Sequence, residues 1–142
     1  MEEITLEQAR TIIRTVFEAG IEAAVRPLAA AVLDRGGHLL AFERQDGTPP
    51  GRFEIARGKD HGAVMLGIGG FAQRDRAEAQ PYFMAALNGV YGGRMVPVPG
   101  GVLVRGASGR VIGAVGVTGD TSENDAAAAL AGIKAAGLAG EA

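Results

Sequence analysis

The sequence predicts an α+β domain in which an antiparallel sheet carries helices on its faces. Two β-hairpins are expected, over residues 28–43 and 102–117, and each consists of two apolar runs joined by a glycine-containing turn. Segments with helical apolar spacing precede, separate and follow the two hairpins. This order favours an antiparallel sheet over a doubly wound parallel sheet, because each hairpin supplies two antiparallel neighbours.

The composition fits one globular domain over residues 1–142. Hydrophobic residues make up 47% of the chain and charged residues 21%, which is ordinary for a globular protein and argues against a disordered chain. The net charge of −2, without any basic run, argues against nucleic-acid binding. No apolar stretch of about 18 residues occurs, so no membrane-spanning helix is expected. Cysteine is absent and the acidic N-terminus lacks a signal-peptide pattern, so we expect a cytoplasmic protein without disulfides or thiolate metal sites.

Residues 5–20 are predicted to form the first helix. Thr5 and the residues up to Gln8 form a capping-box start, and apolar residues recur at helical spacing from Leu6 to Phe17. The first hairpin follows, with strands over residues 28–33 and 38–43 and a turn over Asp34–Gly37.

Two helices are predicted between the hairpins, over residues 53–66 and 77–88, with Pro81 in the first turn of the second. Residues 90–101 contain four glycines and two prolines, so they are predicted to form an irregular loop, and long loops of this kind are usually functional. The second hairpin has its turn at residues 106–109. The last helix is expected to begin after residues 118–125.

Three stretches of the sequence resemble the GlcG/HbpS family, also described as DUF336 or haem-degrading domains. The hairpin AAAVLDRGGHLLAFERQDG carries the pattern D-x-x-G-x-L…R-x-D-G, and IARGKDHGA carries the pattern A-R-x-K-x-x-x-A. The third stretch, VPGGVLVRGASGRVIGAVGVTGDTSENDAAAALAG, matches the family's glycine-rich signature. The chain departs from the family at Gly62, where Thr is usual, and at His61, where Tyr or another bulky residue often stands.

The resemblance implies a profilin-like α+β domain with a central antiparallel sheet, assembled into homo-oligomers. Members of the family are described as haem-binding proteins, as accessories of glycolate or diol catabolism, or as products of aromatic-degradation clusters. The segment AEAQPYFMAALNGVYGGRMVPVPGG is more similar to the catabolic members.

Arg57 and His61 form the main predicted site. They are four residues apart in the predicted helix 53–66, so they share one helical face. Imidazole is a haem ligand and a general base near neutral pH, and a guanidinium matches the planar shape of a carboxylate. We therefore predict that His61 is the catalytic or iron-ligating residue and that Arg57 binds an anionic group. An ion pair of Arg57 with Glu54 or Asp60, and a His61 without a role, are the alternatives.

Tyr91 and Arg94 lie in the glycine-rich loop, and we predict that they contact a carboxylate of the same ligand. This prediction requires a hollow shared by Arg57, His61 and the loop around Arg94. An exposed loop arginine is the alternative. Met95 is a second conceivable iron ligand, but an apolar anchor of the loop is the favoured interpretation.

Lys59 and Thr118 complete the predicted ligand-binding set. Lys59 lies two residues from Arg57, so the two side chains do not share a helical face directly. Thr118 opens the segment before the last helix, where exposed N–H groups and the helix dipole bind anions. The acidic residues of this segment favour capping of the helix instead.

Three functions follow. The first is the binding of haem or a related tetrapyrrole, with His61 as axial ligand and the arginines on the propionates. The second is a cofactor-free enzyme of aromatic or organic-acid catabolism, which hydrolyses or isomerises an unsaturated, muconate-like dicarboxylate while His61 moves protons. The third is an assembly partner whose glycine-rich loop packs against another subunit. Haem binding comes first because it is the commonest description of the family.

Overall fold

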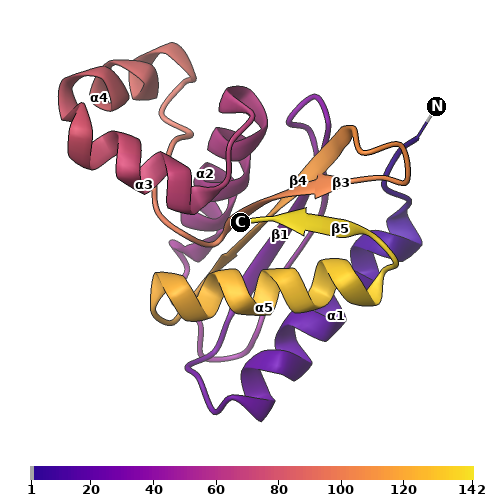
Figure 1. Cartoon of the computed structure of the whole chain (residues 1–142). Helices are drawn as coiled ribbons and strands as arrows, with labels where there is room; N and C mark the ends of the chain where they lie inside the picture. Colours follow the sequence, from indigo (N-terminus) through magenta and orange to yellow (C-terminus); the bar gives the residue numbers. More distant parts are fainter. Residues whose placement is uncertain (1) are drawn as a thin grey trace.

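The computed structural model describes residues 2–142, and within them five antiparallel strands form one sheet with helices on both faces (Figure 1). The strands lie in the order β2-β1-β4-β3-β5. They comprise β1 (Ala29–Asp34), β2 (Leu39–Arg44), β3 (Gly101–Arg105), β4 (Val111–Thr118) and β5 (Ala139–Glu141). The helices are α1 (Leu6–Glu22), α2 (Arg52–Leu66), α3 (Gly70–Ala79), α4 (Pro81–Val90) and α5 (Ser122–Ala135). The predicted α+β class and antiparallel sheet are confirmed.

Both predicted hairpins form, and the central pairing of the sheet joins them. Strand β1 pairs with β2 along one edge and with β4 along the other, where Ala29 lies opposite Thr118. The turn of the first hairpin uses Gly37 at φ +83°, and the turn of the second uses Gly109 at φ +81°. Among residues 2–142, no helix is both long enough and apolar enough to cross a bilayer.

Helix α1 begins where the capping box predicts. The hydroxyl of Thr5 accepts a hydrogen bond from the Gln8 backbone at 3.0 Å, and the Gln8 side chain accepts one from the Thr5 backbone at 3.0 Å. The helix continues two residues beyond the predicted end and is followed by Ala24, whose φ of +57° is left-handed. Such a conformation strains any residue that has a Cβ atom.

The region between the hairpins differs from the prediction. In the described chain it contains three helices instead of two, because residues 70–79 form α3 and α4 begins only at Pro81. Proline has no N–H to continue the preceding helix, and it forces Gln80 out of the helical region, to φ −139° and ψ 68°. The sequence also gave no indication of β5. Helix α5 begins at Ser122, earlier than predicted, because Thr121 caps it.

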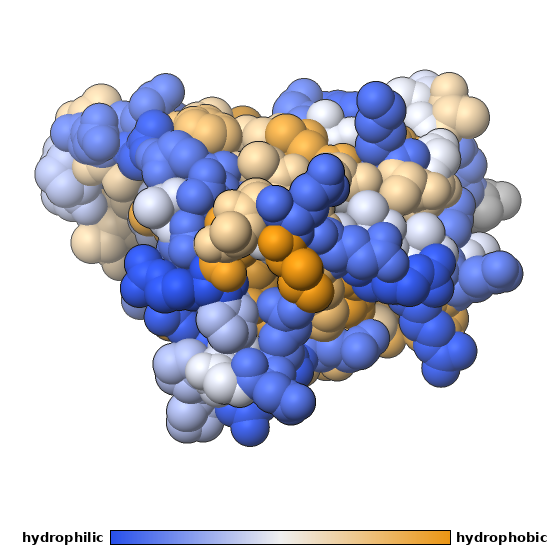
Figure 2. Space-filling model, turned by 90° about the horizontal axis from the view of Figure 1, so that it is seen from below, coloured by the Kyte–Doolittle hydropathy of each residue, from blue (hydrophilic) through white to orange (hydrophobic). Residues whose placement is uncertain are grey.

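Helices α1 and α5 cover one face of the sheet and form the main core with it. The side chains that alternate along each strand toward this face are branched or small, as a half-buried sheet requires. The core consists chiefly of Ile12, Ile13, Val16, Leu28, Ala30, Val32, Val102, Val104, Val115, Val117, Ala129 and Ile133. Seen from the lower side of Figure 1, apolar residues gather near the centre of the surface and hydrophilic residues surround them (Figure 2).

Helix α2 covers the other face, where glycines let its backbone approach the sheet closely. A Cβ added at Gly116 would lie 2.0 Å from the carbonyl oxygen of Ala56, and one added at Gly101 would lie 2.3 Å from that of Lys59. No side chain fits under the helix at these two positions, so the glycines of β3 and β4 set the height of α2 above the sheet. These two glycines thereby fix the position of Arg57 and His61, the α2 side chains of the candidate site.

Helices α3 and α4 extend away from the sheet at one end of the molecule (Figure 1). Within α4, only Met84 is buried, although the helix is largely apolar. Tyr82 is 74% exposed and Val90 is 69% exposed. In this structure α4 therefore presents apolar side chains to solvent.

Candidate functional site

The candidate site is centred on His61 of α2, whose ring is held by the glycine-rich loop. Nδ1 of His61 lies 3.0 Å from the backbone oxygen of Arg94, and the ring of Tyr91 lies 6.4 Å from the His61 ring in an edge-to-face arrangement. The first hairpin turn contacts the other edge of the ring, because a Cβ added at Gly37 would lie 3.3 Å from Cδ2 of His61. His61 is 6% exposed. Three segments far apart in the sequence therefore meet at one imidazole.

Arg57 lies one helical turn before His61, and its charge acts on the same imidazole. Burial lowers the pKa of His61, and the positive charges of Arg94 and Arg57 lower it further, while the hydrogen bond to the Arg94 carbonyl raises it. The imidazole is thus kept neutral near pH 7. Nε of Arg57 is buried and has no hydrogen-bond partner among residues 2–142. Neither alternative ion pair of Arg57 is present among these residues.

The loop that carries Tyr91 and Arg94 is irregular, as predicted, and is anchored at both ends. Gly92 and Gly93 take left-handed φ values of +67° and +79°, and the Gly93 N–H donates to the Asn88 carbonyl at 2.7 Å. Met95 is 7% exposed and packs against α2, where a Cβ added at Gly62 would lie 3.1 Å from its sulfur. Met95 is therefore an apolar anchor, and the absence of a side chain at Gly62 makes room for it. The side chain of Arg94 reaches solvent.

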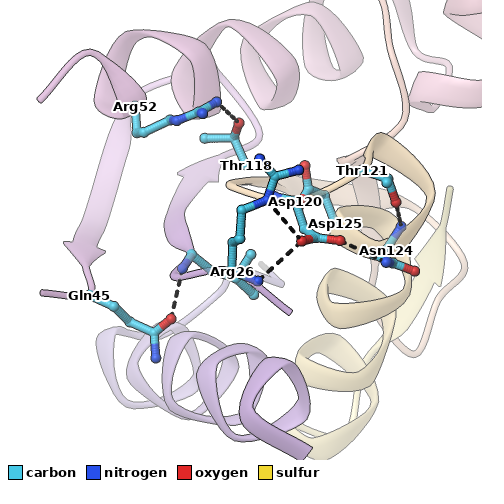
Figure 3. Close-up of polar contacts among 9 residues, drawn as sticks. Arg26, Gln45, Arg52, Thr118, Asp120, Thr121, Asn124 and Asp125 are labelled. Carbon is cyan, nitrogen blue, oxygen red and sulfur yellow. Dashed lines mark hydrogen bonds and ion pairs between the residues drawn. The ribbon is translucent and has the colours of Figure 1, made fainter. Parts of the chain in front are cut away.

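Lys59 and Thr118 lie apart from this cluster, on the side of α2 that faces the sheet and the start of α5. Nζ of Lys59 donates to the carboxylate of Asp125 at 3.1 Å and to the Val117 carbonyl at 3.0 Å. The hydroxyl of Thr118 accepts a hydrogen bond from Arg52 at 3.4 Å (Figure 3). Lys59 is 3% exposed and Thr118 is 2% exposed, so the polar atoms of both are engaged inside the protein.

The turn between β4 and α5 is closed by its own side chains (Figure 3). The Thr121 hydroxyl caps α5 by accepting from the Asn124 backbone at 3.2 Å. The carboxylate of Asp120 accepts from the Asn124 side chain at 2.7 Å and from the Arg26 backbone at 3.1 Å. These hydrogen bonds hold the pKa of Asp120 well below its usual range. The segment therefore does cap the helix, but the capping side chain is that of Thr121 and not one of the predicted acidic residues.

Asp60 is a buried acid, which the sequence indicated only as a partner for an Arg57 ion pair. The residue is 0% exposed, and neither carboxyl oxygen has a hydrogen-bond partner among residues 2–142. Its carboxyl carbon would lie 3.0 Å from a Cβ added at Gly116, so the group lies between α2 and the sheet. Burial raises the pKa of Asp60 well above its usual value, although the charge of Arg57 opposes the shift. The position of Asp60 between Lys59 and His61 in the motif is the only sequence signal that could have indicated it.

None of the four principal hollows on the surface of the described residues is lined by Arg57, His61 or Arg94, beneath which a shared hollow was expected. One of about 520 Å³ lies beside the end of α1, and one of about 590 Å³ lies near Arg35 and Ser108. The two smaller ones are lined by residues of α1 and α5 and by residues around His38. The site is instead a compact cluster around His61. Its ring contacts the backbone of Arg94 and the ring of Tyr91, and Arg57 acts on it through its charge.

Comparison with known proteins gives one family over almost the whole chain. The model of the family described as "Haem degrading protein HbpS-like" matches residues 4–134. An uncharacterized 15.0 kDa protein from the dhaT-dhaS intergenic region of Citrobacter freundii is 32% identical over 124 residues, which cover 86% of this chain and 84% of that protein.

Solved structures share the fold. The crystal structure of HbpS is 27% identical with a TM-score of 0.81 and is matched over 94% of this chain and 90% of its own. Protein ORFY of Klebsiella pneumoniae, a DUF336 protein, is 29% identical with a TM-score of 0.81 over 96% of this chain and 93% of its own. PduOC, solved in complex with haem, is 21% identical with a TM-score of 0.86 over 99% of this chain and 100% of its own, a likeness that concerns the fold alone.

Proposed function

The chain belongs to the family of HbpS-like haem degrading proteins, and from this premise we propose that it binds haem where Arg57, His61, Tyr91 and Arg94 meet. The observation that carries the proposal is the His61 imidazole, which is held by the backbone of the glycine-rich loop and has one guanidinium on its own helix and a second on that loop. These are the groups that a haem requires: a nitrogen donor for the iron and cations for the two propionates.

The donor types of the cluster suit haem, but none of the four principal hollows reaches them and His61 is 6% exposed, so binding requires His61 to become more accessible than it is in this structure. Nδ1 of His61 is engaged by the loop, and within residues 2–142 the ring makes no other hydrogen bond, so no other residue competes for Nε2. Arg57 carries a buried nitrogen without a partner, which favours an incoming carboxylate. Tyr91, whose ring lies edge-to-face with that of His61, can cover part of the macrocycle. Bound haem would supply an iron with redox and ligand-binding chemistry that this side-chain set lacks.

A haemin titration followed by the Soret band tests the proposal. We expect the wild-type protein to give a Soret band that His61→Ala abolishes and His38→Ala retains, because the side chain of His38 is 82% exposed on the hairpin turn. Arg57→Ala and Arg94→Ala should each weaken binding about 10-fold, the effect of losing one charge-assisted hydrogen bond, whereas Arg10→Ala on the exposed face of α1 should not. Binding no tighter than to an unrelated control protein would contradict the proposal.

A dicarboxylate enzyme is the second candidate, favoured by the same two arginines. Two guanidinium groups beside a neutral imidazole also suit a small unsaturated diacid, on which His61 would act as general base. The ultraviolet absorbance of muconate-like substrates measures this activity directly. A loss of absorbance that depends on His61 would support the enzyme, and unchanged absorbance with purified protein would exclude it for the compounds tested.

We further propose that the chain forms homo-oligomers through α4, because Tyr82, Phe83 and Val90 expose apolar surface there. Sedimentation velocity should show a species larger than the monomer, and Tyr82→Lys with Val90→Lys should dissociate it. The matched control is Glu78→Lys, which introduces the same charge on α3 without removing apolar surface. A monomeric wild-type protein would contradict this proposal.

A further inference from the structure

We propose that the backbone carbonyl of Arg94 is the positioning group of the site, because it holds His61 as the tautomer protonated on Nδ1 and leaves the lone pair of the ring on Nε2. The inference rests on the function proposed above only for the identity of that ligand. It concerns a property of the protein that exists before any ligand binds.

The hydrogen bond itself determines the tautomer. Nδ1 of His61 lies 3.0 Å from the carbonyl oxygen of Arg94. A carbonyl oxygen can only accept, so Nδ1 must donate, and a neutral imidazole has only one proton to give. The lone pair of the ring therefore lies on Nε2. A ligating or basic histidine commonly has its second nitrogen fixed in this way by a carbonyl or carboxylate.

The edge of the ring that carries Nε2 faces the first hairpin turn at Gly37. A Cβ at this position would lie 3.6 Å from Nε2 and 3.3 Å from Cδ2 of His61, so the absence of a side chain at residue 37 leaves this edge its present room. Within residues 2–142, no group donates to or accepts from Nε2. The ring is therefore restrained at Nδ1 and uncommitted at Nε2.

The direction of the Arg94 carbonyl depends on the two glycines before it. Gly92 and Gly93 both have left-handed φ values, and Gly93 is tied to the end of α4 by the hydrogen bond from its N–H to Asn88. A Cβ added at Gly93 would meet no atom within 4 Å. A branched residue there would consequently act through backbone strain alone and turn the loop, including the Arg94 carbonyl.

Nitrogen NMR of the ligand-free protein tests the inference. In ¹⁵N-histidine-labelled protein carrying His38→Gln, His61 is the only histidine, and long-range proton–nitrogen correlations identify which ring nitrogen is protonated. We expect a single neutral tautomer with hydrogen on Nδ1 at pH 7. A ring protonated on Nε2, or an equal mixture of both tautomers as in free imidazole, would overturn the proposal.

Gly93→Val is the variant that should release the ring, and Gly137→Val is its matched control. Gly137 has a similar φ of +78° and equally open surroundings, but it follows α5, far from the loop in the sequence. Both variants carry the same strain, yet only Gly93→Val should populate the second tautomer. If the two variants leave the His61 spectrum equally unchanged, the loop does not position the ring.

The same variants separate this inference from the proposed function. If His61 binds haemin, Gly93→Val should weaken binding about 10-fold or more, the usual effect of losing a group that orients a metal-ligating histidine. A wild-type protein that carries the expected tautomer but does not bind haemin leaves the positioning role intact and removes only the haem proposal. If the ring is protonated on Nε2 in the ligand-free protein and haemin still binds, the haem proposal survives and the positioning role of Arg94 is refuted.

Discussion

Nζ of Lys59 lies 3.1 Å from Oδ2 of Asp125, and the side chains of both residues are almost completely buried, at 3% and 1% exposure. The pair connects α2 to the start of α5, two helices that cover opposite faces of the sheet. Burial lowers the pKa of Lys59 and raises the pKa of Asp125, and the attraction between the two charges offsets part of each shift. The structure thus contains a buried ion pair whose partners depend on each other.

Removing one partner should therefore be strongly destabilising. We expect Lys59→Met to lower the free energy of unfolding by about 3–5 kcal/mol, because it leaves the carboxylate of Asp125 buried and unpaired. Urea unfolding followed by circular dichroism measures the change. Arg74→Ala is the control, since it breaks the partly exposed 2.7 Å pair with Glu123 and should cost less than about 1 kcal/mol. Equal effects of the two substitutions would contradict the prediction.

The close approach of α2 to the sheet predicts that Gly116 cannot be replaced without cost. A methyl group at this position would lie 2.0 Å from the Ala56 carbonyl oxygen, so Gly116→Ala must displace the helix and should destabilise the protein by at least about 1–3 kcal/mol. Thermal unfolding provides the measurement. Gly51→Ala, which meets nothing within 4 Å, should leave the melting temperature unchanged or slightly raised. An unaltered melting temperature for Gly116→Ala would contradict the prediction, because it would show that α2 can move away from the sheet without loss of stability.

The buried carboxyl of Asp60 predicts a pH dependence of stability. Because the pKa of Asp60 is raised in the folded protein, the folded state keeps its proton where the unfolded state has lost it, and this group's contribution to stability falls as the pH rises above about 3.9. Asp60→Asn cannot ionise. We therefore expect the variant to gain stability relative to wild type between pH 4 and pH 8, measured as the difference in unfolding free energy. A difference that stays constant with pH would mean that Asp60 ionises freely.

The strained Ala24 predicts a stabilising substitution. Glycine tolerates the left-handed φ of +57° that alanine adopts there, so Ala24→Gly should leave the protein unchanged or stabilise it by up to about 1 kcal/mol. The neighbouring Ala23 is helical at φ −80°, and Ala23→Gly should instead destabilise by about 0.5–1 kcal/mol. The melting temperature of Ala23→Gly should fall while that of Ala24→Gly stays level or rises, and a decrease in both would contradict the argument.

The elements that the sequence predicts best are those with local signals. The capping box at Thr5 and the glycine turns of both hairpins act through residues a few positions apart, so the pattern contains the whole cause. Strand β5 was missed because Ala139–Glu141 has no strand composition, and the strand exists only through its pairing with β3. The position of Pro81 in the first turn of a helix is confirmed, but the predicted start at residue 77 is too early and α3 was not predicted, because this short helix has little apolar periodicity.

The candidate site was predictable only in part for the same reason. Helical spacing places Arg57 and His61 together, but the approach of Arg94 depends on the path of a loop that the sequence marks only as irregular. Whether Lys59 is buried or faces a ligand is decided by Asp125, far along the chain. The sequence around Asp60 shows only a charged residue within a motif. It does not indicate that the carboxyl is buried between α2 and Gly116 of the sheet.

The pairing of β1 with β4 has a consequence for synthesis of the protein. Ala29 finds its partner Thr118 only after most of the chain has left the ribosome, so the first hairpin emerges with one edge unpaired and its apolar face bare. Pairings between such distant segments slow folding, and exposed strand edges attract other nascent chains. Until residues 111–118 have been synthesised, the unpaired edge and apolar face of the first hairpin are therefore exposed, and in this period chaperone binding should matter most.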